Sequence, residues 1–324
     1  MTIHISESEV RSVFTMAMAL EAVEAVSRKQ ANGEVIVHTR RRFELPGAGF
    51  FHYMAAADYS AGLVAMKQYT FAGGKLKFLV PLYEMSSGGL LAVIEADYMG
   101  QLRTGAASGV ATKYLARKDA TSAAIIGTGG QARTQLEAVA AVRPLDSVSV
   151  YGRDPVRREA FCKEMSGRLG VRVKAARSSA EAAHGAEIIC TATTSGKPVL
   201  AGVDISAGAH VNAIGANHAH KRELDDEAIR RADVLFVDSI EQSKQEAGDL
   251  ILAFQAGESR WQSVNELPQL VTGKVPGRTS DSQTTLFKSN GIAAWDLAAA
   301  AKVFAVSKEK KLGRPLPFWK PDAP

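Results

Sequence analysis

The segment AAIIGTGGQARTQ, at residues 123–135, constrains the fold of this chain more than any other feature. A short apolar run predicts a buried strand, glycines follow it, and the polar stretch after them predicts a helix. The spacing Gly127-x-Gly129-x-x-Ala132 is the dinucleotide-binding fingerprint with alanine in its third position. We therefore expect a strand-turn-helix unit that binds the phosphates of a nucleotide.

Each position of this loop has a physical reason. Gly127 permits the tight turn, and Gly129 lets the backbone approach a pyrophosphate. Ala132 is small enough for the helix to pack on the strand, and the N-terminus of the helix directs free N–H groups at the phosphates. No Gly-Lys-Ser/Thr follows, which excludes a Walker loop and leaves a structural glycine turn as the alternative. The expected cofactor contacts in the loop are Gly127, Thr128, Gly129, Gly130, Gln131 and Ala132.

Strands and helices alternate on both sides of the loop, from residue 118 to residue 291. The expected strands are SAAIIG, SVSVYG, VRVKA, EIICTAT, AHVNAIG and VLFVDS, and the expected helices cover residues 131–142, 155–169, 179–185 and 223–231. This alternation predicts a parallel sheet with right-handed crossovers. The fold class is therefore α/β, and residues 118–291 are expected to form a Rossmann-type, doubly wound dinucleotide-binding domain.

The first 117 residues have a different pattern, typical of an α+β domain. Ser6-x-x-Glu9 is a capping-box pattern at the start of a helix expected over residues 6–32. Short strand-like runs, punctuated by Gly and Pro, cover residues 34–96. A helix rich in small residues is expected at residues 97–117.

The last part of the chain is expected to complete this N-terminal domain. The apolar helix GIAAWDLAAAAKVFAVSKEK is long enough to leave the nucleotide domain and pack on the first one. The final segment, GRPLPFWKPDAP, is rich in proline and is expected to be extended. Residues 1–117 with residues 292–324 are therefore predicted to form one domain.

The composition excludes several classes of protein. Hydrophobic residues make up 46% of the 324 residues and charged residues 23%, as in globular proteins. No apolar run reaches the ~20 residues that span a bilayer. The start, MTIHISESEV, has neither the basic nor the apolar part of a signal peptide, so a cytoplasmic protein is expected. Cys162 and Cys190 are then expected to be free thiols.

The net charge of +5 comes from scattered basic residues. No basic stripe with interleaved aromatic residues is present, so we expect neither nucleic-acid binding nor a membrane partner. An excess of positive charge suits an enzyme that handles small anions equally well.

The end of the second expected strand, VYGRDP, bears on the choice between NAD and NADP. NAD sites place an acidic residue there for the ribose 2′-hydroxyl, whereas NADP sites avoid that charge and use an arginine. Gly152 stands where the acid would be, and the guanidinium of Arg153 can pair with a 2′-phosphate. Asp154 is one residue later and could still reach a 2′-hydroxyl, with Arg153 a solvent-facing turn residue. We favour NADP(H), with NAD(H) as the alternative.

Eight segments, in order and with matching spacing, resemble the ornithine cyclodeaminase/mu-crystallin family, which includes alanine dehydrogenases and reductases of cyclic and acyclic imines. They are MAAADY, AMKQYTF, EADYMGQLRTGAAS, IIGTGGQA, VYGRDP, TATTS, AIGANHAHKRELDD and TLFKSNGIAAWDLAAA. The resemblance covers most of the chain. It implies a substrate-binding and dimerisation domain in the N-terminal half, a nicotinamide cofactor and a homodimer.

The family's site residues carry over to matching positions. Lys67 matches a lysine that contacts the substrate carboxylate or its reacting centre, and Arg103 matches an arginine that clamps the carboxylate. Arg42 is the best match for a second carboxylate-binding arginine, with Arg41 as the alternative because loop lengths differ. Thr104 is expected near the nicotinamide or the cofactor phosphates. The matching segments imply further cofactor contacts at Thr191, Ala192, Thr193, Gly215, Asn217 and Gly291.

The chemistry of these side chains agrees with such a role. An arginine binds a carboxylate through two parallel hydrogen bonds. A buried lysine beside arginines has a lowered pKa, because desolvation and like charge both disfavour the ammonium, and it can act as an acid or a base near neutral pH. The alternative is that Arg42 and Lys67 face solvent on their strands. For Arg103, an unpaired charge among small apolar residues would be costly.

Two positions depart from the cyclodeaminase itself. Asn217 replaces an aspartate that handles protons in the ring closure, and an amide cannot accept a proton; His52 replaces a glutamate. We therefore predict hydride transfer between NAD(P)H and a C=N bond next to a carboxylate. The substrate would be a cyclic ketimine such as pyrroline-2-carboxylate, or an acyclic imine such as iminosuccinate or iminopropionate. His52 and the extra arginine of TRRRFEL favour a dicarboxylate.

Two other functions remain as alternatives. One is the cyclodeaminase, an ammonia-lyase that uses NAD catalytically. The other is a mu-crystallin-like protein that binds a nucleotide and a small ligand with little turnover, and the presence of Lys67 and Arg103 argues against it. His218 and His220 stand two apart without nearby acidic or cysteine ligands, so no metal site is predicted.

Overall fold

The computed structural model describes residues 1–254 and 258–318, and the chain divides into two compact units. The first unit consists of Met1–Arg103 together with Ile292–Pro324, and the second unit of Thr104–Gly291. Helix α3 (Asp97–Leu115) contains the division, between Arg103 and Thr104. The sequence had suggested a boundary at the end of this helix, after residue 117.

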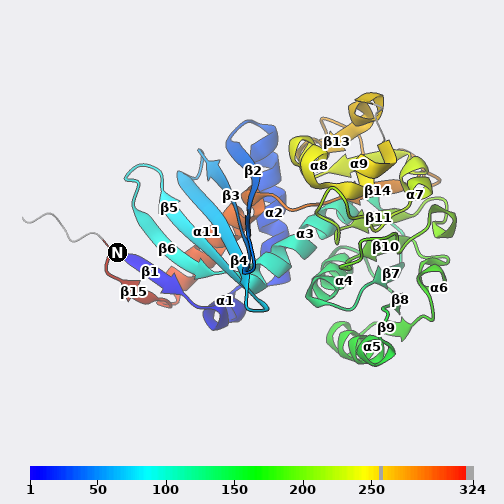
Figure 1. Cartoon of the computed structure of the whole chain (residues 1–324), viewed down its shortest axis with the longest axis horizontal. Helices are drawn as coiled ribbons and strands as arrows, with labels where there is room; N and C mark the ends of the chain where they lie inside the picture. Colours follow the sequence, from blue (N-terminus) through cyan, green and yellow to red (C-terminus); the bar gives the residue numbers. More distant parts are fainter. Residues whose placement is uncertain (255–257, 319–324) are drawn as a thin grey trace, which may run out of the picture. The chain divides into compact units, whose positions relative to one another are not determined.

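The first unit is built on a seven-stranded sheet with the order β15-β1-β6-β5-β4-β3-β2 (Figure 1). Strands β2 to β6 form an antiparallel meander, as the strand-like runs of residues 34–96 predicted. Strand β1 pairs parallel with β6 and antiparallel with β15. Strands β1 and β15 had not been predicted. The strands are β1 (Thr2–Ile5), β2 (Val35–Leu45), β3 (Gly49–Asp58), β4 (Leu63–Ala72), β5 (Lys75–Glu84), β6 (Leu90–Glu95) and β15 (Arg314–Leu316).

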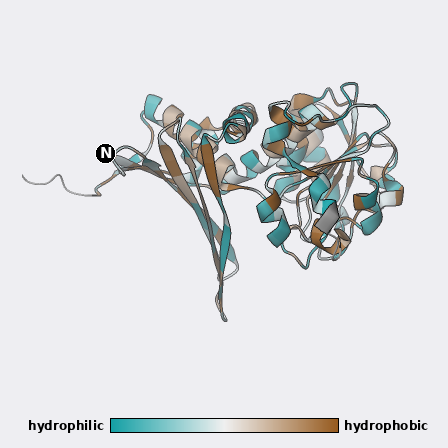
Figure 2. Cartoon of the chain, turned by 90° about the horizontal axis from the view of Figure 1, so that it is seen from above, coloured by the Kyte–Doolittle hydropathy of each residue, from teal (hydrophilic) through white to brown (hydrophobic). Residues whose placement is uncertain are grey.

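Helices cover one face of this sheet. They are α1 (Glu7–Val13), α2 (Met16–Ala31) and α11 (Ala293–Glu309). Helix α11 packs on α2 and on strands β2 to β5, and Figure 2 shows the helices together on one side of the sheet. Ser6 and Glu9 form the predicted capping box. The single helix predicted for residues 6–32 is wrong in one respect, because the backbone is extended at Phe14 and Thr15 caps a second helix.

The second unit contains an eight-stranded, all-parallel sheet with the order β13-β12-β14-β11-β10-β7-β8-β9, which confirms the Rossmann-type class. The strands are β7 (Ser122–Ile126), β8 (Ser147–Tyr151), β9 (Arg172–Ala175), β10 (Ile188–Thr191), β11 (His210–Ala213), β12 (Val234–Val237), β13 (Val264–Glu266) and β14 (Thr285–Lys288). Of these, β13 and β14 had not been predicted.

The helices of the second unit are α4 (Gly130–Val142), α5 (Pro155–Leu169), α6 (Ser179–Ala183), α7 (Asp226–Arg230), α8 (Ile240–Glu246), α9 (Gly248–Phe254) and α10 (Leu267–Val271), with short 3-10 helices at Gly202–Asp204 and Glu258–Ser263. Four of these helices, α4 to α7, correspond to the predicted ones, whereas α8, α9 and α10 had not been predicted. The helix predicted for residues 223–231 begins only at Asp226, because Asp225 is its N-cap. Residues 223 and 224 precede the helix and are not part of it.

Two apolar clusters cover the two faces of this parallel sheet. Ala124 and Ile126 of β7 belong to one cluster, and Ala123 and Ile125 to the other. A strand that is buried on both faces must be apolar at every position, which is why β7 reads as a continuous run. In the described residues, no helix combines the length and the apolarity needed to cross a bilayer.

The two cysteines lie in the second unit, where Cys162 is in α5 and Cys190 is in β10. Both are buried and free, as predicted. Burial raises the pKa of the Cys162 thiol to about 11 and that of Cys190 to about 12. Neither thiol is therefore ionised near neutral pH.

Candidate active site

The first unit buries a cluster of basic side chains around one carboxylate. Lys67 Nζ lies 2.9 Å from Asp296 Oδ1, and Arg103 Nε donates to the same oxygen at 3.0 Å. Lys67, Arg103 and Asp296 are 5%, 4% and 1% exposed, and Arg40 is buried as well. Two cations, Lys67 and Arg103, on one carboxylate leave an excess of positive charge, which a bound anion would neutralise.

Local structure explains how these groups meet. Lys67 belongs to the helix-covered face of β4, where it pairs in register with Met54 of β3. Asp296 is in the first turn of α11, and Arg103 lies on α3. A Cβ atom at Gly100, one turn before Arg103, would lie 3.0 Å from Lys67 Nζ, so glycine there leaves room for the ammonium.

A β-bulge in β2 decides which arginines reach this face. His38 pairs with Ala55 but Arg41 pairs with Tyr53, so β2 holds one more residue than β3 over this stretch. The extra residue reverses the alternation of side chains. Arg42 therefore lies on the face of its partner His52, whereas Arg41 is exposed on the opposite face.

Arg40, within the bulge, lies near the buried cluster although no sequence pattern had indicated it. It is buried, and its Nη2 lies 3.9 Å from the sulfur of Met54, the strand neighbour of Lys67. Its positive charge also acts on Lys67. A run of three arginines in the sequence does not reveal where a bulge occurs, so this residue could not have been found from alternation.

The electrostatics make Lys67 a titratable group. Burial and then the positive charge of Arg103 lower the pKa of Lys67 to about 8, while Asp296 opposes the shift and Arg40 adds to it. Both the ammonium and the amine are therefore accessible at mildly alkaline pH, as a proton donor or acceptor requires.

His52 lies further along the same face of the sheet. Its Nδ1 is 3.0 Å from Tyr69 Oη, and the ring of Phe50 stacks on it with the centroids 4.2 Å apart. Phe78 stacks on Tyr69 with the centroids 5.3 Å apart. His52 is 3% exposed. This predicted binding residue belongs to an aromatic cluster that borders Lys67, because Lys67 Nζ lies 5.4 Å from the centroid of the Phe78 ring.

Asp296 is a second residue of the buried cluster that had not been predicted. Its surroundings, AAWDLAAAA, are apolar, and a carboxylate that is buried in such a helix needs a cationic partner. That signal was present in the sequence. Arg103 Nη1 and Asp296 Oδ2 are both buried and have no hydrogen-bond partner among the described residues. The cluster thus offers one donor and one acceptor to a ligand.

The glycine loop of the second unit has the geometry of a phosphate cradle. Gly127 has φ of 124°, and a Cβ atom there would lie 2.3 Å from the carbonyl oxygen of Ala192. Gly129 is the N-cap of α4, where no described side chain caps the helix, and no described atom outside its own chain neighbours and helix lies within 4 Å of the position of its Cβ. Ala132 is fully buried. These residues fit a dinucleotide whose phosphates approach the open backbone.

The end of β8 shows what Asp154 does. Its side chain caps helix α5 by accepting the N–H of Arg157 at 3.0 Å, and it lies 3.6 Å from Arg157 Nε. Gly152 lies against Thr128, since a Cβ atom there would be 2.7 Å from Thr128 Cγ2. Arg153 is exposed. The only acid of VYGRDP is thus engaged at a helix terminus.

The other predicted cofactor residues lie elsewhere in the second unit. The carbonyl of Thr104 accepts a hydrogen bond from Gln135 Nε2 at 3.3 Å. Asn217 Oδ1 lies 2.9 Å from His218 Nδ1, after β11. The remaining ones are in or after the last residues of β10, β11 and β14: Thr191, Ala192, Thr193, Gly215 and Gly291. The rings of His218 and His220 are 5.7 Å apart, and the described part of the chain contains no group of three metal-ligating side chains.

Comparison with known proteins identifies relatives over nearly the whole chain. The sequence model of the ornithine cyclodeaminase/mu-crystallin family matches residues 2–311. A Delta(1)-pyrroline-2-carboxylate reductase of Bacillus cereus is 36% identical over 241 residues, which are 74% of each chain.

Solved structures agree with this match. The Thermococcus litoralis Delta(1)-pyrroline-2-carboxylate reductase, in complex with NADH and L-proline, has a TM-score of 0.93 at 35% identity and covers 97% of this chain and 100% of its own. The iminosuccinate reductase of Paracoccus denitrificans, in complex with NAD+, has a TM-score of 0.91 at 27% identity and covers 97% of this chain and 98% of its own.

Proposed function

The chain belongs to the ornithine cyclodeaminase/mu-crystallin family, and we propose that it reduces a carboxylate-bearing imine to an amino acid with a nicotinamide dinucleotide. The observation that carries this proposal is the buried cluster of Lys67 and Arg103 on Asp296, with its excess of positive charge. Relatives of this chain are named as reductases of a cyclic imine and of iminosuccinate. The substrate is accordingly a cyclic ketimine such as pyrroline-2-carboxylate or an acyclic imine such as iminosuccinate or iminopropionate.

Each residue of the cluster would have a different role in the reaction. The free Nη1 donor of Arg103 would hold the carboxylate, with Arg40 and Arg42 adding positive charge on the same face. Asp296 Oδ2 would accept the N–H that forms when the imine nitrogen is protonated. When bound, the reduced nicotinamide supplies hydride to the imine carbon. Lys67, as the ammonium, would donate the proton that the nitrogen gains.

A direct assay tests this function. The full-length protein would be incubated with NADH or NADPH and a panel of imines: pyrroline-2-carboxylate, and the imines that form from pyruvate or oxaloacetate with ammonia. Oxidation of the cofactor with formation of proline, alanine or aspartate is expected for at least one of them. Tight cofactor binding without turnover of any imine would instead support the nucleotide-binding alternative.

The cyclodeaminase alternative is less well supported. The side chain of Asn217 is an amide that faces His218, and it cannot take a proton from a substrate amine. Conversion of ornithine to proline with no net change in cofactor would revive the lyase.

For the cofactor, we propose a preference for NADP(H) over NAD(H). Gly152 leaves no acid at the end of β8, and Asp154 is engaged in capping α5. Arg153 is exposed beside them and is able to pair with a 2′-phosphate. The related structures contain NADH or NAD+, so the preference has to be tested on this chain.

Arg153→Ala is expected to weaken NADPH binding by about tenfold and NADH binding by less than about twofold, because the variant loses one charged hydrogen-bond donor to the 2′-phosphate. Fluorescence titration with both cofactors measures this. Arg168→Ala, at the other end of α5, is the matched control and should change neither affinity. Equal losses for the two cofactors in Arg153→Ala would contradict the 2′-phosphate role.

The pKa of Lys67 predicts the pH dependence of the reduction. Since the ammonium is the proton donor and its pKa is lowered to about 8, kcat/KM should fall by about tenfold for each pH unit above that value. Asp296 stabilises the ammonium, so Asp296→Asn lowers the pKa further and should move the inflection to lower pH. Asp58→Asn serves as the control, because Asp58 is a buried carboxylate of β3 in the same sheet and pairs with Lys29 of α2. An inflection that stays in place in Asp296→Asn would rule out this coupling.

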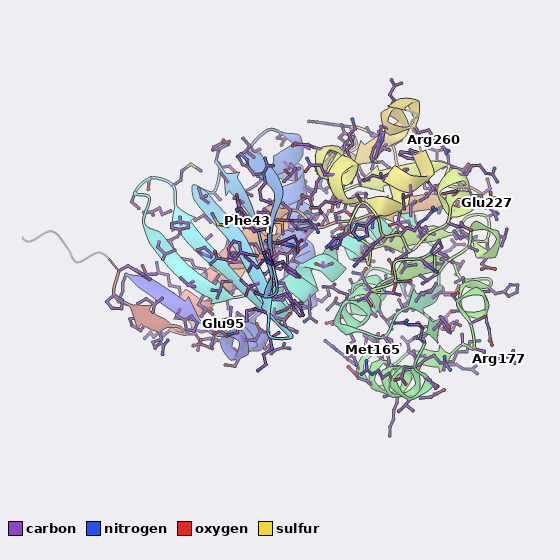
Figure 3. The ribbon with its side chains drawn as sticks, viewed as in Figure 1. Phe43, Glu95, Met165, Arg177, Glu227 and Arg260 are labelled. Atoms are coloured by element: carbon purple, nitrogen blue, oxygen red, sulfur yellow. The ribbon has the colours of Figure 1, made fainter. Side chains whose placement is uncertain are left out.

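We also propose that the chain forms a homodimer through the face of the first unit's sheet that none of the described helices covers. Phe43, labelled in Figure 3, is 54% exposed on this face, and Ile36 and Met66 are 46% and 37% exposed. Such apolar side chains on a sheet face are typical of a protein interface. A mass of one chain in analytical ultracentrifugation would contradict this proposal.

A further inference from the structure

A fully buried carboxylate, that of Glu223, joins the ends of two neighbouring strands in the second unit. Its Oε1 accepts the backbone N–H of Thr193 at 2.6 Å. Its Oε2 accepts the backbone N–H of Gly215 at 2.7 Å and the hydroxyl of Thr191 at 2.8 Å. One side chain thus holds the segments that follow β10 and β11 in register.

A second buried layer holds Glu223 itself. Asp249 Oδ1 accepts the backbone N–H groups of Glu223 and Leu224 at 2.6 and 2.8 Å. Asp249 Oδ2 lies 3.0 Å from Lys288 Nζ, and both of these side chains are fully buried. Lys288, the last residue of β14, also donates to the carbonyl of Ala216. The network therefore connects the ends of three adjacent strands.

Close packing at Gly215 shows how tightly Glu223 is placed. A Cβ atom at Gly215 would lie 2.5 Å from Glu223 Oε1 and 2.3 Å from the carbonyl oxygen of Thr193. Only glycine fits between these groups. The glycine that the family resemblance assigned to the cofactor site is thus required by Glu223.

The strand order indicates which part of a dinucleotide these loops would meet. The chain winds from β7 outward to β8 and β9, and then returns to the other side of β7 with β10, β11 and β14. Ligands of such sheets bind at the carboxyl ends of the strands, across the point where the order reverses. The glycine loop follows β7, and the adenosine ribose belongs at the end of β8. The nicotinamide half would therefore bind at the loops after β10 and β11.

We propose that Glu223 is a positioning residue for the nicotinamide half of the cofactor, acting through the backbone of Thr193 and Gly215. The inference rests on the proposed function for the identity of the nucleotide. Glu223 lies beneath these loops and is fully buried, so it shapes the binding surface from below. The two N–H groups it accepts fix the direction of the peptide planes that the nicotinamide ribose would meet.

The substitution Glu223→Gln separates this role from simple packing. Glutamine has the same shape but only one acceptor oxygen, whereas two backbone N–H groups and one hydroxyl point at the carboxylate. At least one N–H would face the amide nitrogen, and the loop that carries it must move. The adenosine side, at β7 and β8, has no hydrogen bond to Glu223 among the described residues.

Glu187→Gln is the matched control. The carboxylate of Glu187 accepts the backbone N–H groups of Thr121 and Ser122 at 2.8 and 3.0 Å, and Arg117 Nη2 donates to it at 2.8 Å. It therefore ties the chain in the same manner, but at the amino ends of β7 and β10, the edge opposite to the nucleotide loops. Its loss should lower the melting temperature without changing nucleotide affinity.

The experiment measures binding of NADH and NADPH by the full-length variants, together with the adenosine halves AMP and adenosine 2′,5′-bisphosphate. Glu223→Gln is expected to weaken the binding of the dinucleotides by about tenfold, as for one lost hydrogen bond to a charged group. The binding of the adenosine halves is expected to weaken by less than about twofold. Equal losses for the dinucleotides and their halves would overturn the proposal, and so would unchanged affinities with only a lower melting temperature.

Thr191→Val provides a second test if Glu223→Gln does not fold. It removes the hydroxyl that donates to Glu223 and leaves no backbone N–H opposite another donor. The binding of the dinucleotides should weaken by about threefold, and the binding of the adenosine halves should not change. No loss would again overturn the role of Glu223. A wild-type protein that binds both cofactors but reduces no imine contradicts only the proposed function, whereas one that binds neither contradicts both.

Discussion

Replacing Lys67 by alanine is expected to lower kcat for imine reduction by on the order of 10²- to 10⁴-fold, the usual contribution of a positioned proton donor. Lys67 is the group of the cluster whose pKa lies near neutrality, since burial and Arg103 lower it to about 8. Arginine side chains stay protonated and cannot replace it. The measurement is steady-state turnover with a saturating imine, together with titration of the cofactor.

Two comparisons make this result specific. Cofactor affinity should remain within about twofold of wild type, because the proposed role of Lys67 is to donate a proton to the substrate and not to bind the cofactor. Lys77→Ala removes an exposed lysine from β5 of the same sheet and should leave kcat unchanged. If the Lys67→Ala enzyme turns over at a rate near wild type, the assignment of Lys67 as the proton donor is wrong.

Arg103→Ala is expected to raise KM for carboxylated imines by about two orders of magnitude, as for the loss of one partner of a buried charge pair. Its Nη1 is buried without a hydrogen-bond partner among the described residues, and its Nε is held by Asp296, so the guanidinium is oriented before substrate binds. Arg103→Lys keeps the charge but not the fork of donors and should recover only a small part of the affinity.

The substrate itself supplies the control for this prediction. An imine without a carboxylate, such as 1-pyrroline, cannot use the clamp, so its kcat/KM should be nearly the same in wild type and in Arg103→Ala. An unchanged KM for the carboxylated imine, or an equal loss for both substrates, would count against a carboxylate clamp at Arg103. The first result would place the carboxylate elsewhere, and the second would indicate a general disturbance of the cluster.

Several parts of the fold follow from local patterns. The glycine loop, the continuous apolar strand β7 and helix α5 with Asp154 before its first proline are each contained within a short stretch of chain. The break at Phe14 and the short strands β1, β13, β14 and β15 were missed. Length alone does not explain this, because β9 to β12 are equally short and were predicted. The missed strands are stabilised by pairing with distant segments, which no local pattern records.

The candidate site, like the fold, could be predicted only in part from the sequence. Lys67, Arg42 and Arg103 were predicted from residue type and resemblance, but the choice between Arg42 and Arg41 depends on a bulge, which is a property of two paired strands. Arg40 is buried beside this cluster for the same reason. Asp296 contacts Lys67 across 229 residues of sequence, and no local pattern contains such a distance.

The sequence by itself determined the nucleotide fold and the chemical types of the residues that would bind a carboxylate, because periodicity, glycine spacing and side-chain chemistry are local properties. Only the tertiary structure decided which charges share one buried space. The pKa of Lys67 depends on Arg103 and Asp296, and the place of the loops after β10 and β11 depends on Glu223. Both effects arise from burial, which removes water and makes each charge depend on partners that are distant in the chain.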